Sequence, residues 1–192
     1  MKKRYMALGD SISIDLYTDV IGGGAVSQLY KRLCSKQLNN WMLDDRTYDG
    51  CVMSGVRPDL NGHWPADLIT MTIGGNDLLQ HMDRDPAEFI PVFAREYAHL
   101  TSSIRRIHPQ ATVIVGNIYR PSWEDLPKHL EVALGECNRV IGQWVRQRGF
   151  HLADIHGAFL GHEAEYLCHD IEPTLAGATA IADLFEAAFY GE

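Results

Sequence analysis

The sequence predicts an α/β protein built on a parallel sheet of about five strands, with helices on both faces of the sheet. Three observations predict it. Short apolar runs recur along the chain, stretches with helical periodicity separate them, and polar turns follow two of the runs. With 192 residues, of which 46% are hydrophobic, the sequence predicts one domain over residues 1–192.

The first half of the chain supplies three of the predicted strands. Residues 4–8 are nearly all apolar, as is typical of a strand that is covered on both faces. Three consecutive glycines in the next stretch favour a loop, and Val26, Leu29 and Leu33 then recur at helical spacing. The expected elements are, in order, a strand over 4–8, a loop over 14–24, a helix over 25–36, a short strand over 48–55 and a strand over 67–73.

The second half alternates in the same way. A long apolar stripe at 3.6-residue spacing runs from Phe89 to Ile107 and predicts a helix that Pro109 closes. The further expected elements are a strand over 111–119, a helix from about 130 to Gly149, a strand over 150–155 and a C-terminal helix over about 178–189.

Composition excludes several classes of partner. Acidic residues number 25 and basic residues 17, which gives a formal charge of −8, and no Lys/Arg run could neutralise a row of phosphates, so we expect no nucleic-acid partner. No apolar window approaches the roughly 20 residues that span a bilayer. Four scattered cysteines without a CxxC pair predict free thiols. Residues 1–4 resemble the start of a signal peptide, but the apolar run after them is broken at Gly9-Asp10 and no small-residue cleavage site follows, so we expect a cytoplasmic protein. We expect a monomer or a homodimer.

Two polar turns carry the residue types that ester hydrolysis needs. Gly-Asp-Ser at 9–11 follows the first strand, and Gly-Gly-Asn-Asp at 74–77 follows the strand over 67–73. In a parallel sheet, ligands bind outside the carboxyl ends of the strands, so these turns should share one edge. Ser11 offers a nucleophilic oxygen, while the Gly55 backbone N–H and the Asn76 side chain offer donors for a developing oxyanion.

The motifs Gly-Asp-Ser-Ile at 9–12, Ser-Gly at 54–55 and Gly-Gly-Asn-Asp at 74–77 resemble, in this order, those of the SGNH (GDSL-type) hydrolases. The similarity covers essentially the whole chain. It implies a flavodoxin-like three-layer α/β/α sandwich that cleaves an ester or thioester of a small substrate through a covalent acyl-enzyme. It also implies Ser11 as the nucleophile. The implied oxyanion hole consists of the Ser11 N–H, the Gly55 N–H and the Asn76 side chain.

The last motif departs from this family. Its members carry Asp-x-x-His-Pro before the final helix, whereas this chain has His-Asp-Ile-Glu-Pro at 169–173. Our first hypothesis is a reversed pair, in which His169 is the general base and Glu172 accepts its other N–H, because residues three apart in a turn can share a face. The alternatives are a direct action of Glu172 on Ser11 and a base supplied by His162 or His156.

A second class of function stays open, namely a catalytically weak or inactive binding protein on the same fold. The retained serine and asparagine favour the enzyme, because a binding protein has no chemical reason to keep an oxyanion hole. No HExxH or comparable spacing indicates a metal, and no cofactor is implied. We expect residues 14–24 and 120–126 to form the walls of the substrate pocket.

Overall fold

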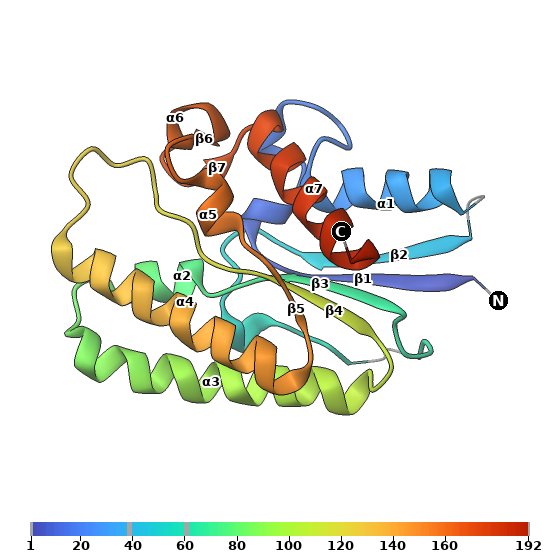
Figure 1. Cartoon of the computed structure of the whole chain (residues 1–192), viewed down its shortest axis with the longest axis horizontal. Helices are drawn as coiled ribbons and strands as arrows, with labels where there is room; N and C mark the ends of the chain where they lie inside the picture. The colour runs from blue at the N-terminus through green and yellow to red at the C-terminus, as the bar shows by residue number, and fades with distance from the viewer. Residues whose placement is uncertain (1, 38–39, 60–61, 192) are drawn as a thin grey trace.

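The computed structural model describes residues 2–37, 40–59 and 62–191 and contains a five-stranded, all-parallel sheet of order β2-β1-β3-β4-β5 (Figure 1). The prediction of a parallel sheet of about five strands is therefore confirmed. The strands are β1 Lys3–Gly9, β2 Trp41–Thr47, β3 Leu68–Thr72, β4 Thr112–Gly116 and β5 His151–Ala153.

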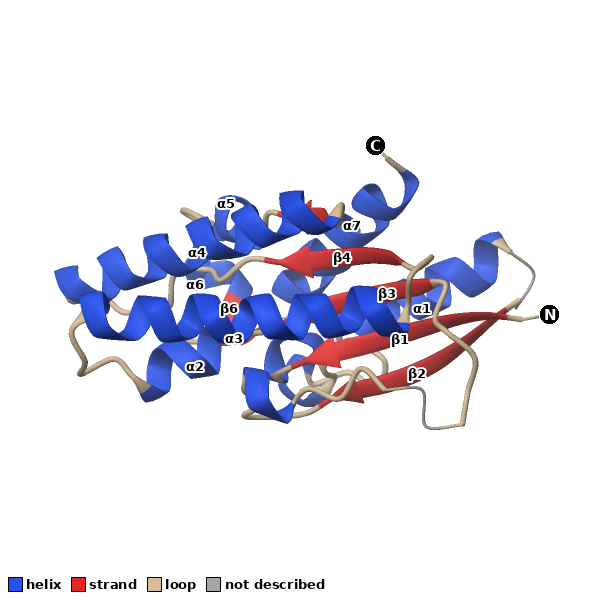
Figure 2. Ribbon diagram, turned by 90° about the horizontal axis from the view of Figure 1, so that it is seen from below, coloured by secondary structure: helices blue, strands red, loops and turns tan. Residues whose placement is uncertain are grey.

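Helices cover both faces of the sheet. In Figure 1, α1 (Ala25–Lys36) and α7 (Leu175–Tyr190) lie above the sheet, while α3 (Pro86–Ile107) and α4 (Lys128–Arg148) lie below it. Figure 2 shows the strands running in one direction behind α3. The short elements are α2 Gly75–Gln80, α5 Ile155–Phe159, α6 Glu163–Tyr166, the 3-10 helices η1 Ser11–Ser13, η2 Leu16–Thr18 and η3 Met53–Gly55, and an antiparallel pair, β6 Leu167–Cys168 and β7 Glu172–Pro173.

The unbroken apolar run of β1 follows from this layering. Met6 and Leu8 pack into the core beneath α3 and α4, whereas Tyr5 and Ala7 pack into the core beneath α1 and α7. All four side chains are at most 1% exposed, so neither face of the strand tolerates a polar alternation. The result is a central strand that delivers Ser11 to the carboxyl edge of the sheet.

The predicted strand over 48–55 is wrong. The second strand is β2, at Trp41–Thr47, and residues 53–55 form η3 instead. β2 lies at the edge of the sheet and carries charged side chains, among them Asp44, which forms an ion pair with the fully buried Arg4 of β1. With this ion pair, a strand that contains three acidic or basic residues can form the edge of the sheet. The same charged residues interrupt the apolar run by which a strand is predicted from sequence.

All four cysteines are free, as predicted. Within the described residues, no helix combines the length and apolar composition that a bilayer crossing requires.

Candidate active site

The candidate site lies at the carboxyl edge of the sheet, where the central strands end together. Gly9 pairs in register with Thr72, the last residue of β3, so the turns that follow β1 and β3 begin side by side. Gly9 has φ +139°, and a Cβ there would lie 2.1 Å from the Thr72 carbonyl oxygen. Only glycine fits this close approach, and it brings Ser11 next to the turn that carries Asn76.

Ser11 is in direct contact with Glu172. Its hydroxyl donates a hydrogen bond of 3.0 Å to Glu172 Oε1, and each residue is only 6% exposed. Ser11 begins η1, one residue beyond the end of β1, and Glu172 begins β7 near the other end of the chain. The structure thus joins a hydroxyl and a carboxylate that stand at the first and last of the motifs in the sequence.

A tight, anchored turn presents Glu172 to Ser11. His169 and Asp170 link β6 to β7, and both adopt the left-handed conformation, with φ of 48° and 68°. The Asp170 carbonyl accepts a hydrogen bond of 2.9 Å from Ser122 N–H, and the Ile171 carbonyl accepts one from the buried Tyr119 hydroxyl. These contacts hold in place two non-glycine residues that would otherwise avoid positive φ.

The environment of Glu172 makes its carboxylate more basic. Burial raises its pKa above the usual value, and the nearby charge of Asp49 raises it further. The hydrogen bond from Ser11 and the charge of His169 act in the opposite direction. The second oxygen, Oε2, is buried and has no hydrogen-bond partner among the described residues. The surroundings of Glu172 therefore favour uptake of a proton by its carboxylate.

A second buried carboxyl borders the same site. Asp10 is 4% exposed, and burial raises its pKa to about 7, with a smaller contribution from the charge of Glu172. The neighbouring Thr72 side chain and Ile12 backbone act in the opposite direction on this pKa, and Asp10 Oδ1 is buried without a hydrogen-bond partner among the described residues. Sequence reasoning did not single out Asp10, because burial decides its pKa and burial is a property of the fold.

No hydrogen bond joins Ser11 to any of the three candidate histidines among the described residues. His169 is exposed, and its ring packs edge-on against Tyr17 at 6.2 Å between centroids. His156 Nδ1 lies 3.1 Å from the Ile118 carbonyl oxygen. His162 stacks on Tyr166 and lies 3.7 Å from a Glu165 carboxylate oxygen. The reversed pair is not formed either, since no hydrogen bond joins His169 to Glu172 in the described part of the chain.

The two predicted oxyanion donors differ in their placement. Asn76 lines the same pocket as Ser11, and its side-chain amide donates one hydrogen bond of 3.0 Å to the Cys51 carbonyl, which leaves a second N–H. Gly55 lies in η3, where its N–H donates a hydrogen bond of 2.8 Å to the Val52 carbonyl. That N–H is engaged within its own turn, and Gly55 is not among the residues that line the pocket.

An apolar pocket with a volume of about 70 Å³ opens beside Ser11. Its polar end carries Asp10, Ser11 and Asn76. Its apolar walls come mainly from α2, α4 and the segment between β4 and α4, and they include Leu78, Leu79, Ile118, Leu126, Leu130 and Leu134. The arrangement suits an ester whose carbonyl lies at Ser11 and whose acyl group lies among the leucines.

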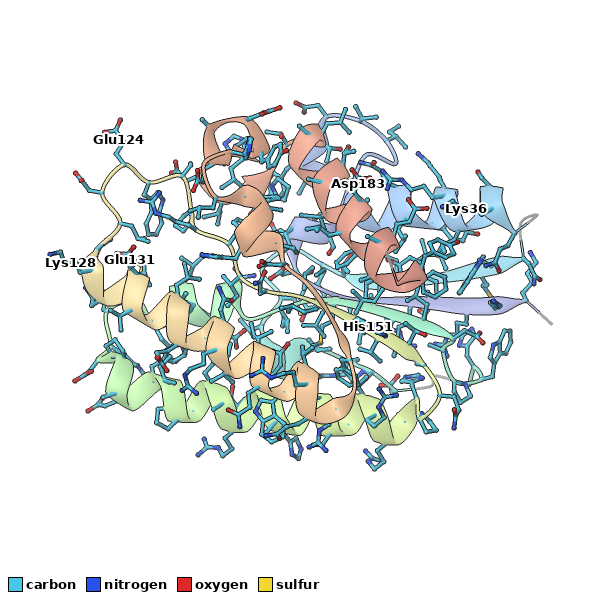
Figure 3. The ribbon with its side chains drawn as sticks, in the orientation of Figure 1. Lys36, Glu124, Lys128, Glu131, His151 and Asp183 are labelled. Carbon is cyan, nitrogen blue, oxygen red and sulfur yellow. The ribbon has the colours of Figure 1, made fainter. Side chains whose placement is uncertain are left out.

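The two predicted pocket walls have different outcomes. Of residues 120–126, Pro121 and Leu126 line the pocket, whereas no residue of 14–24 does. The leucines of α4 were missed, because a stripe at helical spacing reads as core packing. Figure 3 shows the charged side chains of Lys128 and Glu131 on the outside at the start of this helix, and that of Glu124 on the loop before it. Its opposite face supplies the buried Leu130 and Leu134.

The sheet order and the polar groups at its carboxyl edge define a three-layer α/β/α protein of the flavodoxin-like kind, with a hydrolase-type site. The chain belongs to the GDSL-like lipase/acylhydrolase family, whose model matches residues 7–180.

Individual relatives agree with this assignment. The spore germination lipase LipC of Bacillus licheniformis is 29% identical, over an alignment that covers 100% of this chain and 98% of the relative. The crystal structure of the lipase Lip_vut3 from a goat rumen metagenome is 25% identical, with a TM-score of 0.82 and 98% of each chain covered. The fold is also that of a phospholipase A1 from Streptomyces albidoflavus NA297, at 21% identity and a TM-score of 0.74, with 98% of this chain and 100% of that chain covered.

Proposed function

We propose that this protein is a serine esterase that cleaves carboxylic esters or thioesters with an apolar acyl group through a covalent acyl-enzyme. The observation that carries the proposal is the 3.0 Å hydrogen bond from the Ser11 hydroxyl to Glu172, beside a pocket lined by leucines. Glu172 takes the place of the missing histidine and acts on Ser11 directly.

The reaction balances with these two residues. Glu172 accepts the hydroxyl proton while Ser11 Oγ attacks the carbonyl carbon and forms a tetrahedral oxyanion. Collapse of that intermediate breaks the bond to the leaving alcohol or thiol, which takes the proton from Glu172 and leaves an ester on Ser11. Water then attacks this ester, gives its proton to Glu172, and releases the acid as Ser11 regains its hydrogen.

A carboxylate can perform this role only if its pKa is raised, because an ordinary carboxylate is a weak base for a hydroxyl. Burial of Glu172 supplies the shift, and the unpartnered Oε2 means that no donor competes for its charge within the described residues. In the proposed mechanism the fold therefore compensates for the change of residue type at position 172.

Two donors are available for the oxyanion. The Ser11 backbone N–H donates no hydrogen bond to another described residue, and Asn76 has an unused side-chain N–H. Both residues line the pocket. Donors fixed in advance favour the transition state, because no reorganisation is needed when the negative charge develops. We assign the oxyanion site to these two groups rather than to Gly55.

A serine-directed fluorophosphonate, with peptide mapping of the labelled protein, tests the proposal. We expect the label on Ser11, and we expect Ser11→Ala to lose both labelling and the hydrolysis of nitrophenyl butyrate. Ser35→Ala is the matched control, since Ser35 is an exposed α1 residue whose hydroxyl only returns to the Lys31 carbonyl. Labelling or hydrolysis that persists in Ser11→Ala would refute the role of Ser11.

A binding protein on the same fold is the second candidate, favoured by the absence of any described histidine against Ser11. The two candidates separate in one comparison. The binding protein would be stabilised thermally by a medium-chain fatty acid, yet it would neither hydrolyse nitrophenyl butyrate nor react with the fluorophosphonate.

A further inference from the structure

Two neighbouring residues of α2 bind the segment that leads into η3. The Asn76 side-chain amide donates a hydrogen bond of 3.0 Å to the Cys51 carbonyl. The Asp77 carboxylate accepts the Met53 N–H, at 3.2 Å to Oδ1 and 3.1 Å to Oδ2. Adjacent side chains of one helical turn therefore contact the same three residues, 51–53.

Asp77 is buried and does not face the substrate pocket. Its side chain lies outside the lining of the pocket beside Ser11, although Asn76 belongs to that lining, and Asp77 is only 6% exposed. Burial raises the pKa of Asp77 to about 6, and the hydrogen bond from Met53 acts in the opposite direction. A buried carboxylate is costly unless hydrogen bonds compensate for its lost water, so the contact with Met53 accounts for much of its place in the fold.

The Cys51 carbonyl determines how the Asn76 amide is oriented. A side-chain amide carries two N–H donors in one plane, so binding of one donor to a fixed acceptor sets the direction of the other. The other N–H of Asn76 is the proposed oxyanion donor. Such a donor is effective when it is oriented before the negative charge develops, and its orientation therefore depends on the position of the Cys51 carbonyl.

The position of Cys51 depends in turn on Asp77. The Cys51 N–H donates to the Tyr48 carbonyl at 3.3 Å, and the Tyr48 N–H donates to the Gly9 carbonyl at 3.2 Å, so these bonds fix the start of the segment to the end of β1. In the described part of the chain, the Met53 N–H forms the only hydrogen bond between residues 51–55 and α2, apart from that of Asn76 itself. Asp77 thus sets the spacing between the Cys51 carbonyl and α2.

We propose that Asp77 is a positioning residue for the hydrolysis. By binding the Met53 N–H it fixes the Cys51 carbonyl, and that carbonyl directs the second N–H of Asn76 toward the developing oxyanion. This inference rests on the proposed esterase function. A displacement of about 1 Å in a catalytic group can cost about 100-fold in rate. Because the oxyanion exists only in the transition state, loss of the contact should lower kcat and leave KM nearly unchanged.

Steady-state kinetics on nitrophenyl butyrate test this inference. Asp77→Ala should lower kcat by about 10-fold to 100-fold, with KM within about twofold of the parent. Asp77→Asn should keep most of the activity, because its amide oxygen can still accept the Met53 N–H. The matched control is Asp83→Ala, an exposed acidic residue in the turn after α2, which should behave like the parent.

A double-mutant cycle separates positioning from a general loss of structure. When Asn76 is already alanine, Asp77→Ala should cause little further loss, because the group that Asp77 positions is absent. The inference would be overturned by an equal loss from Asp77→Ala in both backgrounds, by a loss confined to KM, or by an Asp77→Asn enzyme as impaired as Asp77→Ala.

Two further measurements decide the cases that kinetics leaves open. If Asp77→Ala does not fold, Met53→Pro removes the same N–H from the donor side at the first residue of η3, where proline is tolerated, and Met53→Ala controls for the lost side chain. Nuclear magnetic resonance relaxation of the Asn76 side-chain ¹⁵N should show an ordered amide in the parent and a more mobile one in Asp77→Ala. Equal order in both would overturn the inference. A parent that hydrolyses no ester, but whose Asn76 amide loses order in Asp77→Ala, would refute the esterase proposal and leave the positioning contact established.

Discussion

Replacement of Glu172 by glutamine is the sharpest test of the direct serine–carboxylate pair. Glutamine keeps the size of the side chain and an oxygen that can accept the 3.0 Å hydrogen bond from Ser11, but it cannot take the proton. A positioned general base contributes about 100-fold to 10,000-fold in rate, which corresponds to about 3 to 5 kcal/mol of transition-state stabilisation. We expect kcat/KM to fall within that range.

The pH dependence carries the same information. Activity of the parent should rise with pH as Glu172 loses its proton, with a midpoint above the usual glutamate value of 4.5, because burial raises the pKa. Glu172→Gln should give a low rate without that rise. The assay is hydrolysis of nitrophenyl butyrate from pH 4 to 9, with denaturant unfolding of each variant to confirm that the fold is kept.

His169→Ala provides the control, since His169 is exposed and is joined to Glu172 only through its charge. We expect it to keep most of the activity. Its midpoint should shift to slightly higher pH, since a charge that favours ionised Glu172 is lost. A Glu172→Gln enzyme as active as the parent would refute the reasoning. An inactive His169→Ala enzyme would instead restore the reversed pair, and an inactive His156→Ala or His162→Ala enzyme would place the base in the preceding loop.

The remaining predictions concern the walls of the site. Asn76→Ala should lower kcat by about 100-fold to 1,000-fold with little change in KM, because its spare N–H acts on the oxyanion, and steady-state kinetics would show an effect confined to KM if it bound the ground state instead. Burial holds the pKa of Asp10 at about 7 against a usual 3.8, so its contribution to stability is full below pH 4 and is lost as pH rises through 7. The gap corresponds to at most about 4 kcal/mol, and urea unfolding at pH 5 and pH 8 should show a smaller loss in Asp10→Asn. Leu126→Trp should narrow the pocket and lower kcat/KM for nitrophenyl octanoate by about 10-fold or more while sparing nitrophenyl acetate, and equal losses on both esters would mean that the acyl group lies elsewhere.

Sequence patterns could predict the strands whose side chains meet a core on both faces. For that reason β1 is apolar without a break from Tyr5 to Leu8, and β3 is apolar except for the buried Thr70 and Thr72. The edge strand β2 was not predicted, because charged residues such as Asp44 break its apolar pattern. Asp44 forms an ion pair with Arg4 of the neighbouring strand, and the pattern within one segment cannot show such a partner. An apolar search therefore finds the centre of this sheet more easily than its edge.

The candidate site was predictable as a set of residues but not as a set of contacts. The sequence motifs indicated Ser11, His169 and Glu172 as candidate site residues. They did not predict whether His169 or Glu172 forms the hydrogen bond with Ser11. The two left-handed residues of the β6–β7 turn decide this, since they leave His169 exposed and place Glu172 on the inner side. Backbone conformation of that kind depends on anchors such as Tyr119, which lies 52 positions away from its partner Ile171.

The distance along the chain between Ser11 and Glu172 has a consequence for how the protein matures. The two residues are separated by 161 positions, and Glu172 lies three positions before the first residue of α7, which covers one face of the sheet. Contacts between such distant segments form late in folding, because the loop they close is long. The serine of a partly folded chain would therefore lack Glu172, its proposed base. Recovery of esterase activity during refolding would then time the docking of the last segment, separately from the earlier return of helical signal.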